Sequence, residues 1–160
     1  MIVKEATRLN LGSGAYPKEG FTNVDIEDAH ADVIGDFTKM EFAGVEEVEM
    51  SHVLEHISWQ STAAVLRLVR SWMVDGGSIR IEVPDMEAIM ARGIFDIAAQ
   101  IAIYGIQSAQ GEFHLAGFTW NSLRAHMLDA GFSVVSGRSF ASGHPERIGF
   151  PCLEVIGTAA

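Results

Sequence analysis

Cysteine, basic side chains and long apolar runs are scarce in this chain of 160 residues. The only cysteine, Cys152, has no partner for an internal disulfide, so nothing indicates an oxidising compartment. The 11 Lys and Arg residues stand against 21 Asp and Glu, and the net charge of −10 disfavours binding to nucleic acid or to anionic membranes. The most apolar segment, Ile94 to Ile106, contains Asp96 and Gln100 and is shorter than the ~20 residues of a transmembrane helix.

Targeting signals and internal boundaries are also missing. Lys4 and Glu5 interrupt the N-terminal apolar residues, so no signal peptide is visible. No repeat, low-complexity tract or linker divides the chain, and a hydrophobic content of 48% is typical of a packed globular protein. We therefore expect one domain spanning residues 1–160, a cytoplasmic location and a small-molecule partner.

Short β-like runs alternate with segments of helical periodicity, which predicts an α/β sheet with helices on its faces. Candidate strands cover residues 6–11, 21–25, 31–34, 45–51, 78–83, 132–137 and 152–157. Apolar residues at helical spacing predict a helix between Ser58 and Asp75 that stops at Gly76-Gly77, and another from the N-cap Thr119 to Gly131. Asp85 can cap a third helix running towards Ile106, with Gly93 weakening its middle.

A glycine turn, Gly12-Ser13-Gly14, follows the first candidate strand, and Asp25 ends the second. Glycines at such a turn allow a positive φ and a close approach of the backbone to a ligand. An acidic residue at the end of the next strand can accept hydrogen bonds from two ribose hydroxyls. On its own the turn is equally consistent with an ordinary tight turn, but its pairing with Asp25 favours a nucleoside site.

The turn departs from two common nucleotide motifs. A dinucleotide fingerprint needs a third glycine where this chain has Pro17, and a phosphate-binding loop needs a Gly-Lys-Ser/Thr that is absent. The segment between Gly14 and Asp25 is also too short for a crossover helix with its two loops, since a whole crossover takes at least about 10–12 residues.

Two further segments carry candidate functional residues. Asp36 can accept a hydrogen bond from an exocyclic amine and Phe37 can offer an apolar face to a purine, although Asp36 can equally cap a turn. His52 and His56 fit the His-x-x-Glu-His pattern of one metallopeptidase class. That pattern belongs inside a helix, whereas here it begins at the end of a strand, so a structural histidine is favoured over zinc.

The ordered series of motifs resembles the class I S-adenosylmethionine-dependent methyltransferases, in particular the type 11-like group of small bacterial proteins. Residues 9–14, Leu-Asn-Leu-Gly-Ser-Gly, are similar to the family's Leu-Asp-Leu-Gly-Cys-Gly. The other matches are Asn23-Val24-Asp25, Gly35-Asp36-Phe37, residues 51–56, the Asp75-Gly76-Gly77 turn, Val83-Pro84-Asp85, and His114 with the helix and strand after it. The resemblance covers nearly the whole chain. It implies a single doubly wound Rossmann-like sheet, mostly parallel with a C-terminal antiparallel strand, whose first crossover helix is short or absent.

The resemblance also implies S-adenosylmethionine as the cofactor, and from the position of the histidine pattern we expect no metal. The cofactor-binding residues that it implies are Asn10, Leu11, Gly12, Ser13, Gly14, Asp25, Ile26, Asp36, Phe37, Ser51 and His52. In this set the glycine turn approaches the methionyl part, Asp25 holds the ribose, and Asp36 with Phe37 addresses the adenine. Ser51 and His52 line the floor of the site.

Two departures from the family pattern bear on the site. Asn10 stands where aspartate is usual, which removes a charge near the amino acid end of the cofactor. The missing crossover helix normally covers one face of the pocket, so we expect a site that is open or covered by a partner. A general base is needed only for a weakly acidic acceptor, and His56, His114 and Glu55 are the candidates, with none preferred.

The predicted function is methyl transfer to a small molecule or a sugar-containing glycan precursor. The alternatives are a non-catalytic methyltransferase-fold binding module and, less favoured, a nicotinamide-dependent reductase or a zinc hydrolase. The acceptor itself is not readable, because acceptor pockets lie on variable loops. The apolar helix at residues 94–106 is either core or the face of a homodimer.

Overall fold

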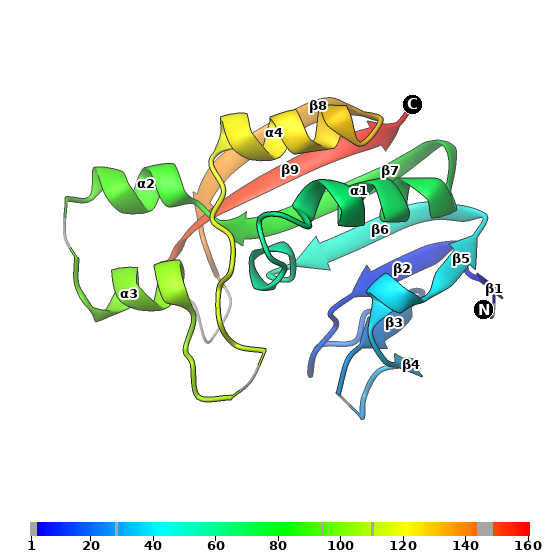
Figure 1. The fold of residues 1–160 in the computed structure, drawn as a ribbon, viewed down its shortest axis with the longest axis horizontal. Helices are drawn as coiled ribbons and strands as arrows, with labels where there is room; N and C mark the ends of the chain where they lie inside the picture. Colours follow the sequence, from blue (N-terminus) through cyan, green and yellow to red (C-terminus); the bar gives the residue numbers. More distant parts are fainter. Residues whose placement is uncertain (1–2, 28, 94, 110, 144–148) are drawn as a thin grey trace.

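A seven-stranded sheet forms the centre of the computed structural model, which describes residues 3–27, 29–93, 95–109, 111–143 and 149–160 (Figure 1). The strand order is β4-β3-β2-β6-β7-β9-β8. The strands are β2 (Arg8–Leu11), β3 (Thr22–Asp25), β4 (Val33–Ile34), β6 (Val45–Ser51), β7 (Met73–Pro84), β8 (Phe132–Ala141) and β9 (Pro151–Ala159). Among the described strands of this sheet, β9 runs antiparallel to β7 and β8, and all other neighbouring pairs are parallel. The predicted fold class, with its C-terminal antiparallel strand, is confirmed.

All seven predicted strands are present, and two short ones were missed. β1 (Val3–Glu5) and β5 (Glu41–Ala43) pair with each other as a small parallel sheet. Strands of three residues carry too little alternation to be recognised from sequence. β6 has the predicted bounds, whereas β7, β8 and β9 are longer than predicted.

The two strongest helical patterns form α1 (Thr62–Trp72) and α4 (Trp120–Asp129). α1 ends before the predicted Gly76-Gly77, because the chain enters β7 at Met73, which pairs with Val45 of β6. Thr119 caps α4 as expected, and its side chain accepts a hydrogen bond from the Ser122 amide. None of the helices among the described residues is long and apolar enough to cross a bilayer.

The third predicted helix is two helices, α2 (Met86–Ala91) and α3 (Ile97–Tyr104). Each has its own cap, since Asp85 accepts from the amide of Ala88 and Asp96 from the amide of Ala99. Gly93 lies between them with φ 64°, so the position expected to weaken one helix instead separates two. Ile94, the first residue of the predicted apolar helix, lies outside the described residues.

The chain turns directly from β2 back into β3, and the predicted loss of the first crossover helix is confirmed. The amides of Gly12 and Ser13 both donate to the Val24 carbonyl, at 2.7 and 3.1 Å, so the turn rests against the next strand. Figure 1 shows α1 and α4 over the same face of the sheet, with α2 and α3 beyond its carboxyl end. Among the described residues no helix covers the opposite face. The structure thus goes further than the prediction, because one helical layer is missing as a whole.

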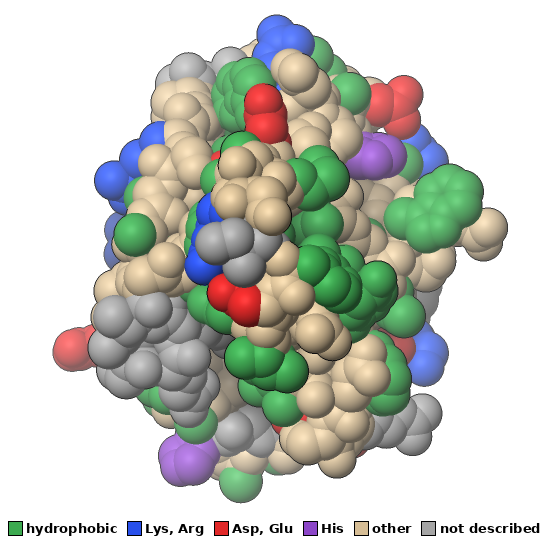
Figure 2. All heavy atoms as spheres, turned by 90° about the vertical axis from the view of Figure 1, so that its left-hand side faces the viewer, with side chains coloured by type: hydrophobic (Ala, Val, Ile, Leu, Met, Phe, Trp, Pro, Cys, Tyr) green, Lys and Arg blue, Asp and Glu red, His purple; other side chains and the backbone are tan. Residues whose placement is uncertain are grey.

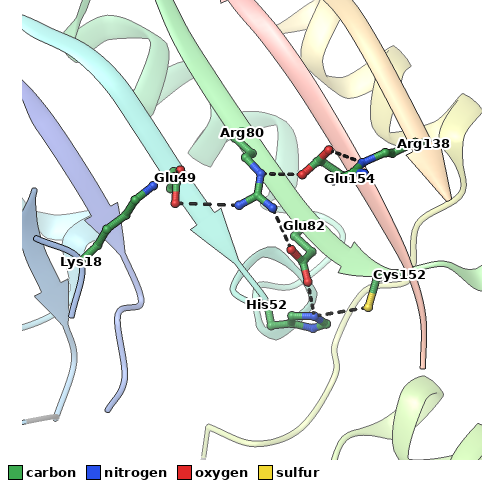
Figure 3. Close-up of polar contacts among 8 residues, drawn as sticks. All are labelled: Lys18, Glu49, His52, Arg80, Glu82, Arg138, Cys152 and Glu154. Carbon is green, nitrogen blue, oxygen red and sulfur yellow. Dashed lines mark hydrogen bonds and ion pairs between the residues drawn. The ribbon is translucent and has the colours of Figure 1, made fainter. Parts of the chain in front are cut away.

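Side chains alternate along the strands in agreement with this one-sided cover. The covered face carries fully buried apolar residues, namely Leu9, Leu11, Val48, Ile79, Ile81 and Val155. The open face carries charged residues on the intervening positions of β6, β7 and β9, among them Glu49, Arg80, Glu82 and Glu154 (Figure 3). A sheet face without helices is stable in water only when it is polar, and this alternation provides that.

Ion pairs join these charges both within and between strands (Figure 3). Arg80 Nε donates to Glu154 Oε2 at 2.6 Å, and Arg138 Nε donates to the other oxygen, Oε1, at 2.7 Å. Arg80 also contacts Glu82 at 3.2 Å, and Lys18 pairs with Glu49. Hydrogen bonds from Arg138 and Arg80 hold the pKa of Glu154 below its ordinary value. Glu154 therefore connects three strands of the open face.

We predict that Glu154→Gln lowers the free energy of unfolding by about 1–2 kcal/mol near neutral pH, because it removes one charge from two charge-assisted hydrogen bonds. The pKa of Glu154 is lowered in the folded state, so its contribution is present above its ordinary pKa and lost as the pH falls through the lowered value. The difference between wild type and variant should shrink in acid. Urea unfolding of wild type and variant, once near neutral pH and once in acid, measures this difference.

Glu47→Gln is the matched control, because Glu47 pairs with Arg8 at 3.3 Å where both side chains are substantially exposed. Such exposed pairs contribute about 0–1 kcal/mol. Equal losses of unfolding free energy for the two variants would show that the ion pairs of Glu154 stabilise the fold no more than an exposed pair does.

Candidate functional site

Two adjoining cavities open where β2, β3, β4 and β6 end, with volumes of about 430 and 730 Å³. They share Gly12, Asp25, His52, His56 and Gly111, so they form one cleft. The predicted cofactor-binding residues that line it are Asn10, Gly12, Ser13, Gly14, Asp25, Ile26, Asp36, Phe37, Ser51 and His52. Leu11 does not line the cleft, because its side chain is wholly buried in the core. A cleft at the carboxyl edge of the strands, where the strand order reverses, is the usual ligand site of such sheets.

The glycine turn is held tightly at the rim of this cleft. Gly12 has φ 67°, and a Cβ built on it would lie 2.3 Å from Cγ2 of Val53, so no side chain fits there. The Gly14 amide donates to Asp25 Oδ2 at 2.9 Å, which ties the turn to the end of β3. Asn10 donates from its side-chain amide to Asn23 Oδ1 at 2.9 Å, so the neutral residue at this position has a partner within the sheet.

Asp36 begins the short helix η1 (Phe37–Lys39), so the capping alternative considered from sequence is present in the structure. Its Oδ1 accepts hydrogen bonds from the Thr38 amide at 3.0 Å and the Thr38 hydroxyl at 2.6 Å. These contacts, mainly the one with the hydroxyl, and the nearby Lys39 hold the pKa of Asp36 below its ordinary value. Asp36 is therefore an anionic cap that also faces the cleft, beside the half-buried ring of Phe37.

His52 is a buried cation between the carboxylates of Glu55 and Glu82, and Figure 3 shows its contacts with Glu82 and Cys152. Its Nδ1 lies 2.9 Å from Glu55 Oε1, and its Nε2 lies 3.3 Å from Glu82 Oε1 and 3.6 Å from Cys152 Sγ. Burial alone would lower the pKa of His52, but the contacts with Cys152, Glu55 and Glu82 outweigh it and raise the pKa to about 11. The same contact holds the pKa of Glu82 below its ordinary value. Both ring nitrogens are thus occupied, and His52 is not available as a base.

The backbone at His52 adopts φ 55°, which is rare for a residue with a side chain. The conformation lets the ring turn back beneath the strand end while the chain proceeds into η2 (Leu54–His56). Glu82 and Cys152 were not identified from sequence as partners of His52, since they lie 30 and 100 residues away. Strand alternation places Glu82 on the polar face of β7 and could have indicated it.

The three candidate bases lie together beside the cleft. The rings of His56 and His114 meet edge to face with centroids 4.9 Å apart, and Glu55 is 1% exposed. Burial lowers the pKa of His114, which keeps its ring neutral. Of the three, only His56 lines both cavities. The arrangement does not match a His-x-x-Glu-His zinc site, because both ring nitrogens of His52 already contact carboxylates.

Several cleft residues were missed from sequence because they belong to the open face. Lys18, Glu49 and Arg80 line the larger cavity, together with Tyr16 and Glu112. In a sheet with helices on both faces, the first crossover helix would cover this position. Its absence extends the cleft onto the charged face of β6 and β7.

We predict that Gly12→Ala destabilises the fold by at least about 1 kcal/mol more than Gly14→Ala. Both glycines have positive φ, which costs an alanine about 1–2 kcal/mol, but only the Cβ at Gly12 meets Val53. At Gly14 nothing lies within 4 Å of an added Cβ. Urea unfolding of the two variants measures the difference, and equal destabilisation would contradict the close contact with Val53.

Solved structures with a similar fold include several methyltransferases. A SAM-dependent methyltransferase from Methanosarcina mazei aligns with a TM-score of 0.64 and 14% identity over 96% of this chain and 92% of its own. A SAM-dependent methyltransferase from Archaeoglobus fulgidus aligns with a TM-score of 0.65 and 16% identity over 94% and 85% of the two chains.

A third structure was solved with ligands. The 1,6-didemethyltoxoflavin-N1-methyltransferase of Burkholderia thailandensis, with bound 1,6-didemethyltoxoflavin and S-adenosylhomocysteine, aligns with a TM-score of 0.59 and 13% identity over 98% and 72% of the two chains. No family model and no curated protein matches the sequence. The likeness establishes the class I methyltransferase fold.

Proposed function

We propose that this chain is an S-adenosylmethionine-dependent methyltransferase that acts on a small molecule or a sugar-containing glycan precursor. The observation that carries the proposal is the convergence of the glycine turn, Asp25 and the Asp36-Phe37 pair on one cleft. These residues come from three different strand ends, and each type suits one part of a nucleoside ligand. The class I methyltransferase fold supports the same conclusion.

Each part of the cleft has a chemistry that fits one part of the cofactor. Gly12 has no side chain, so the methionyl part of the cofactor can approach the backbone at the rim of the cleft. A Cβ at this position would also collide with Val53. Asp25 offers a carboxylate for the ribose hydroxyls, since each of its oxygens can accept more than one hydrogen bond. Phe37 and Ile26 supply apolar surface for adenine, and Asp36 an acceptor for its amine.

The charge of the cleft also suits this cofactor, whose sulfonium supplies an activated methyl group when bound. Asp25, Asp36, Glu49 and Glu112 line the cleft, and Arg80 and Lys18 lie next to Glu49. Because the methyl group needs no activation, the protein contributes mainly by aligning the acceptor with it. His56 is our candidate for removing a proton from a hydroxyl acceptor, since it is the one candidate base that lines both cavities.

Titration of the purified protein with S-adenosylhomocysteine tests the proposal by calorimetry. We expect saturable binding that Asp25→Ala weakens about tenfold or more, because the variant removes a charged acceptor worth about 1.5–3 kcal/mol. Asp75→Asn is the matched control, since Asp75 pairs with Arg70 and its side chain is 89% exposed. Absence of any heat or melting shift at millimolar ligand would refute the proposal.

The missing helical layer favours a second candidate, a non-catalytic binding module with a methyltransferase fold. The cleft continues onto the open charged face, where a partner could complete it. Binding of S-adenosylhomocysteine without methyl transfer to any acceptor in a broad panel, together with tight association with a partner enzyme, would favour this candidate. The nicotinamide-dependent reductase lacks support, because the glycine turn has no third glycine and no following helix.

The homodimer also stays a proposal, supported by the exposed apolar surface around α2 and α3 (Figure 2). Ile97 is 70% exposed, and Ile106 and Phe95 are exposed beside it, so α3 is not a core helix. A patch of this kind favours a partner. The absence of nucleic acid and membrane partners and the cytoplasmic location remain predictions from composition.

We predict that the protein is dimeric in light scattering coupled to size-exclusion chromatography, and that Ile97→Glu makes it monomeric because a buried charge opposes association. Leu128→Glu is the control, since Leu128 is 44% exposed on α4. A monomeric wild-type protein at high concentration would exclude this interface.

A further inference from the structure

Glu55, His56 and His114 form a compact cluster beside the cleft, built from two segments distant in sequence. One possible ligand atom from each residue lies within 4.8 Å of the other two. Two backbone hydrogen bonds dock the segments on each other, because the amides of Leu115 and Ala116 donate to the Glu55 carbonyl at 2.7 and 3.1 Å. The cluster is therefore fixed by these main-chain contacts together with the edge-to-face contact of the two histidine rings.

Backbone carbonyls set the tautomers of both histidines. His56 Nδ1 lies 3.1 Å from the Phe113 carbonyl, and His114 Nδ1 lies 2.8 Å from the Ala102 carbonyl. A carbonyl only accepts hydrogen bonds, so each Nδ1 carries a proton, and in the neutral ring the lone pair that a metal needs is on Nε2. Histidines that bind metals are commonly held in this way by a carbonyl behind the ring.

Glu55 supplies an independent indication that a cation fits here. Its carboxylate is buried, with Oε1 bound to His52 and Oε2 without any hydrogen-bond partner. An unpartnered carboxylate oxygen in a protein interior is costly, and neither imidazole of the cluster donates a hydrogen bond to it. A bound cation satisfies all three groups at once.

We propose that Glu55, His56 and His114 bind a divalent first-row transition-metal ion, of which Zn²⁺ is the representative, at the side of the cleft. Two imidazole nitrogens and one carboxylate oxygen are a ligand set that such ions prefer over Mg²⁺ or Ca²⁺. The spacing lets small side-chain rotations bring the three atoms to the usual bond lengths of about 2.0–2.2 Å. Since His56 lines the cleft, the proposed metal site adjoins it.

A second group, His52 with Glu82 and Cys152, also has the spacing of a metal site. It does not carry the proposal, because both nitrogens of His52 already contact carboxylates and a metal would have to displace them. None of its oxygens is among the unpartnered atoms. The variant Cys152→Ser distinguishes the two groups, because Cys152 belongs only to the second.

The test is titration of the untagged, chelator-treated full chain with Co²⁺, followed by visible absorption, and then with Zn²⁺ in competition. We expect one equivalent of Co²⁺ to produce visible bands that Zn²⁺ abolishes. His56→Ala, His114→Ala and Glu55→Gln should each weaken Zn²⁺ binding by about tenfold or more, since even residues that only orient ligands contribute about 10–100-fold. His126→Ala, a histidine on α4 outside the cluster, and Cys152→Ser should bind as the wild type does.

Far-UV circular dichroism identifies variants that do not fold, and the partly exposed His56 keeps the test usable if Glu55→Gln is one of them. A folded wild type that binds no Co²⁺ would overturn the proposal. So would unchanged binding in His56→Ala and His114→Ala, or a loss confined to Cys152→Ser. The measurement does not depend on methyl transfer, so its failure and that of the proposed function are distinguishable.

Discussion

The short connection between β2 and β3 is the constraint on which the rest of the structure depends. It leaves no room for a helix, so the Gly12–Gly14 turn rests directly on Val24 and Asp25. The face of the sheet that such a helix would cover is therefore exposed to water and carries charged side chains. On this face, cross-strand ion pairs of Glu154 hold neighbouring strands together, whereas in a sheet covered on both sides packed helices contribute to this.

The same constraint shapes the site. Without a covering helix the cleft runs from Asp36, at the adenine side of our proposal, to Arg80 on the open face. Its floor is organised by the imidazolium of His52, which holds Glu55 on one side and Glu82 on the other. This pairing sets the direction in which η2 leaves β6, and so presents His56 to the cleft. A buried ion pair thus positions His56, which is the proposed base in the metal-free site and becomes a ligand, no longer a base, when the proposed metal is bound.

Much of this could be predicted from sequence, because it depends on local patterns. The alternation in residues 45–51 gave β6 with its bounds, and Thr119 marked the start of α4. The glycine turn and Asp25 were assigned to a nucleoside site from their positions at the ends of predicted strands, and Asp36 was assigned to the adenine from the family resemblance. The unpredicted features depend on contacts between distant residues, such as His52 with Cys152 or Glu55 with the segment that carries His114. Of the helical layer that is absent among the described residues, only the loss of the first crossover helix was predicted. Composition does not show whether helices cover one face of a sheet or both.

The most direct test of the account is a crystal structure of the protein soaked with S-adenosylhomocysteine. We predict density for the ligand along the carboxyl edge of the strands. Its amino acid end would lie at the Gly12–Gly14 turn, its ribose hydroxyls on Asp25 and its adenine against Phe37. Crystals that stay without ligand at saturating concentration, or a ligand bound away from this cleft, would contradict the account.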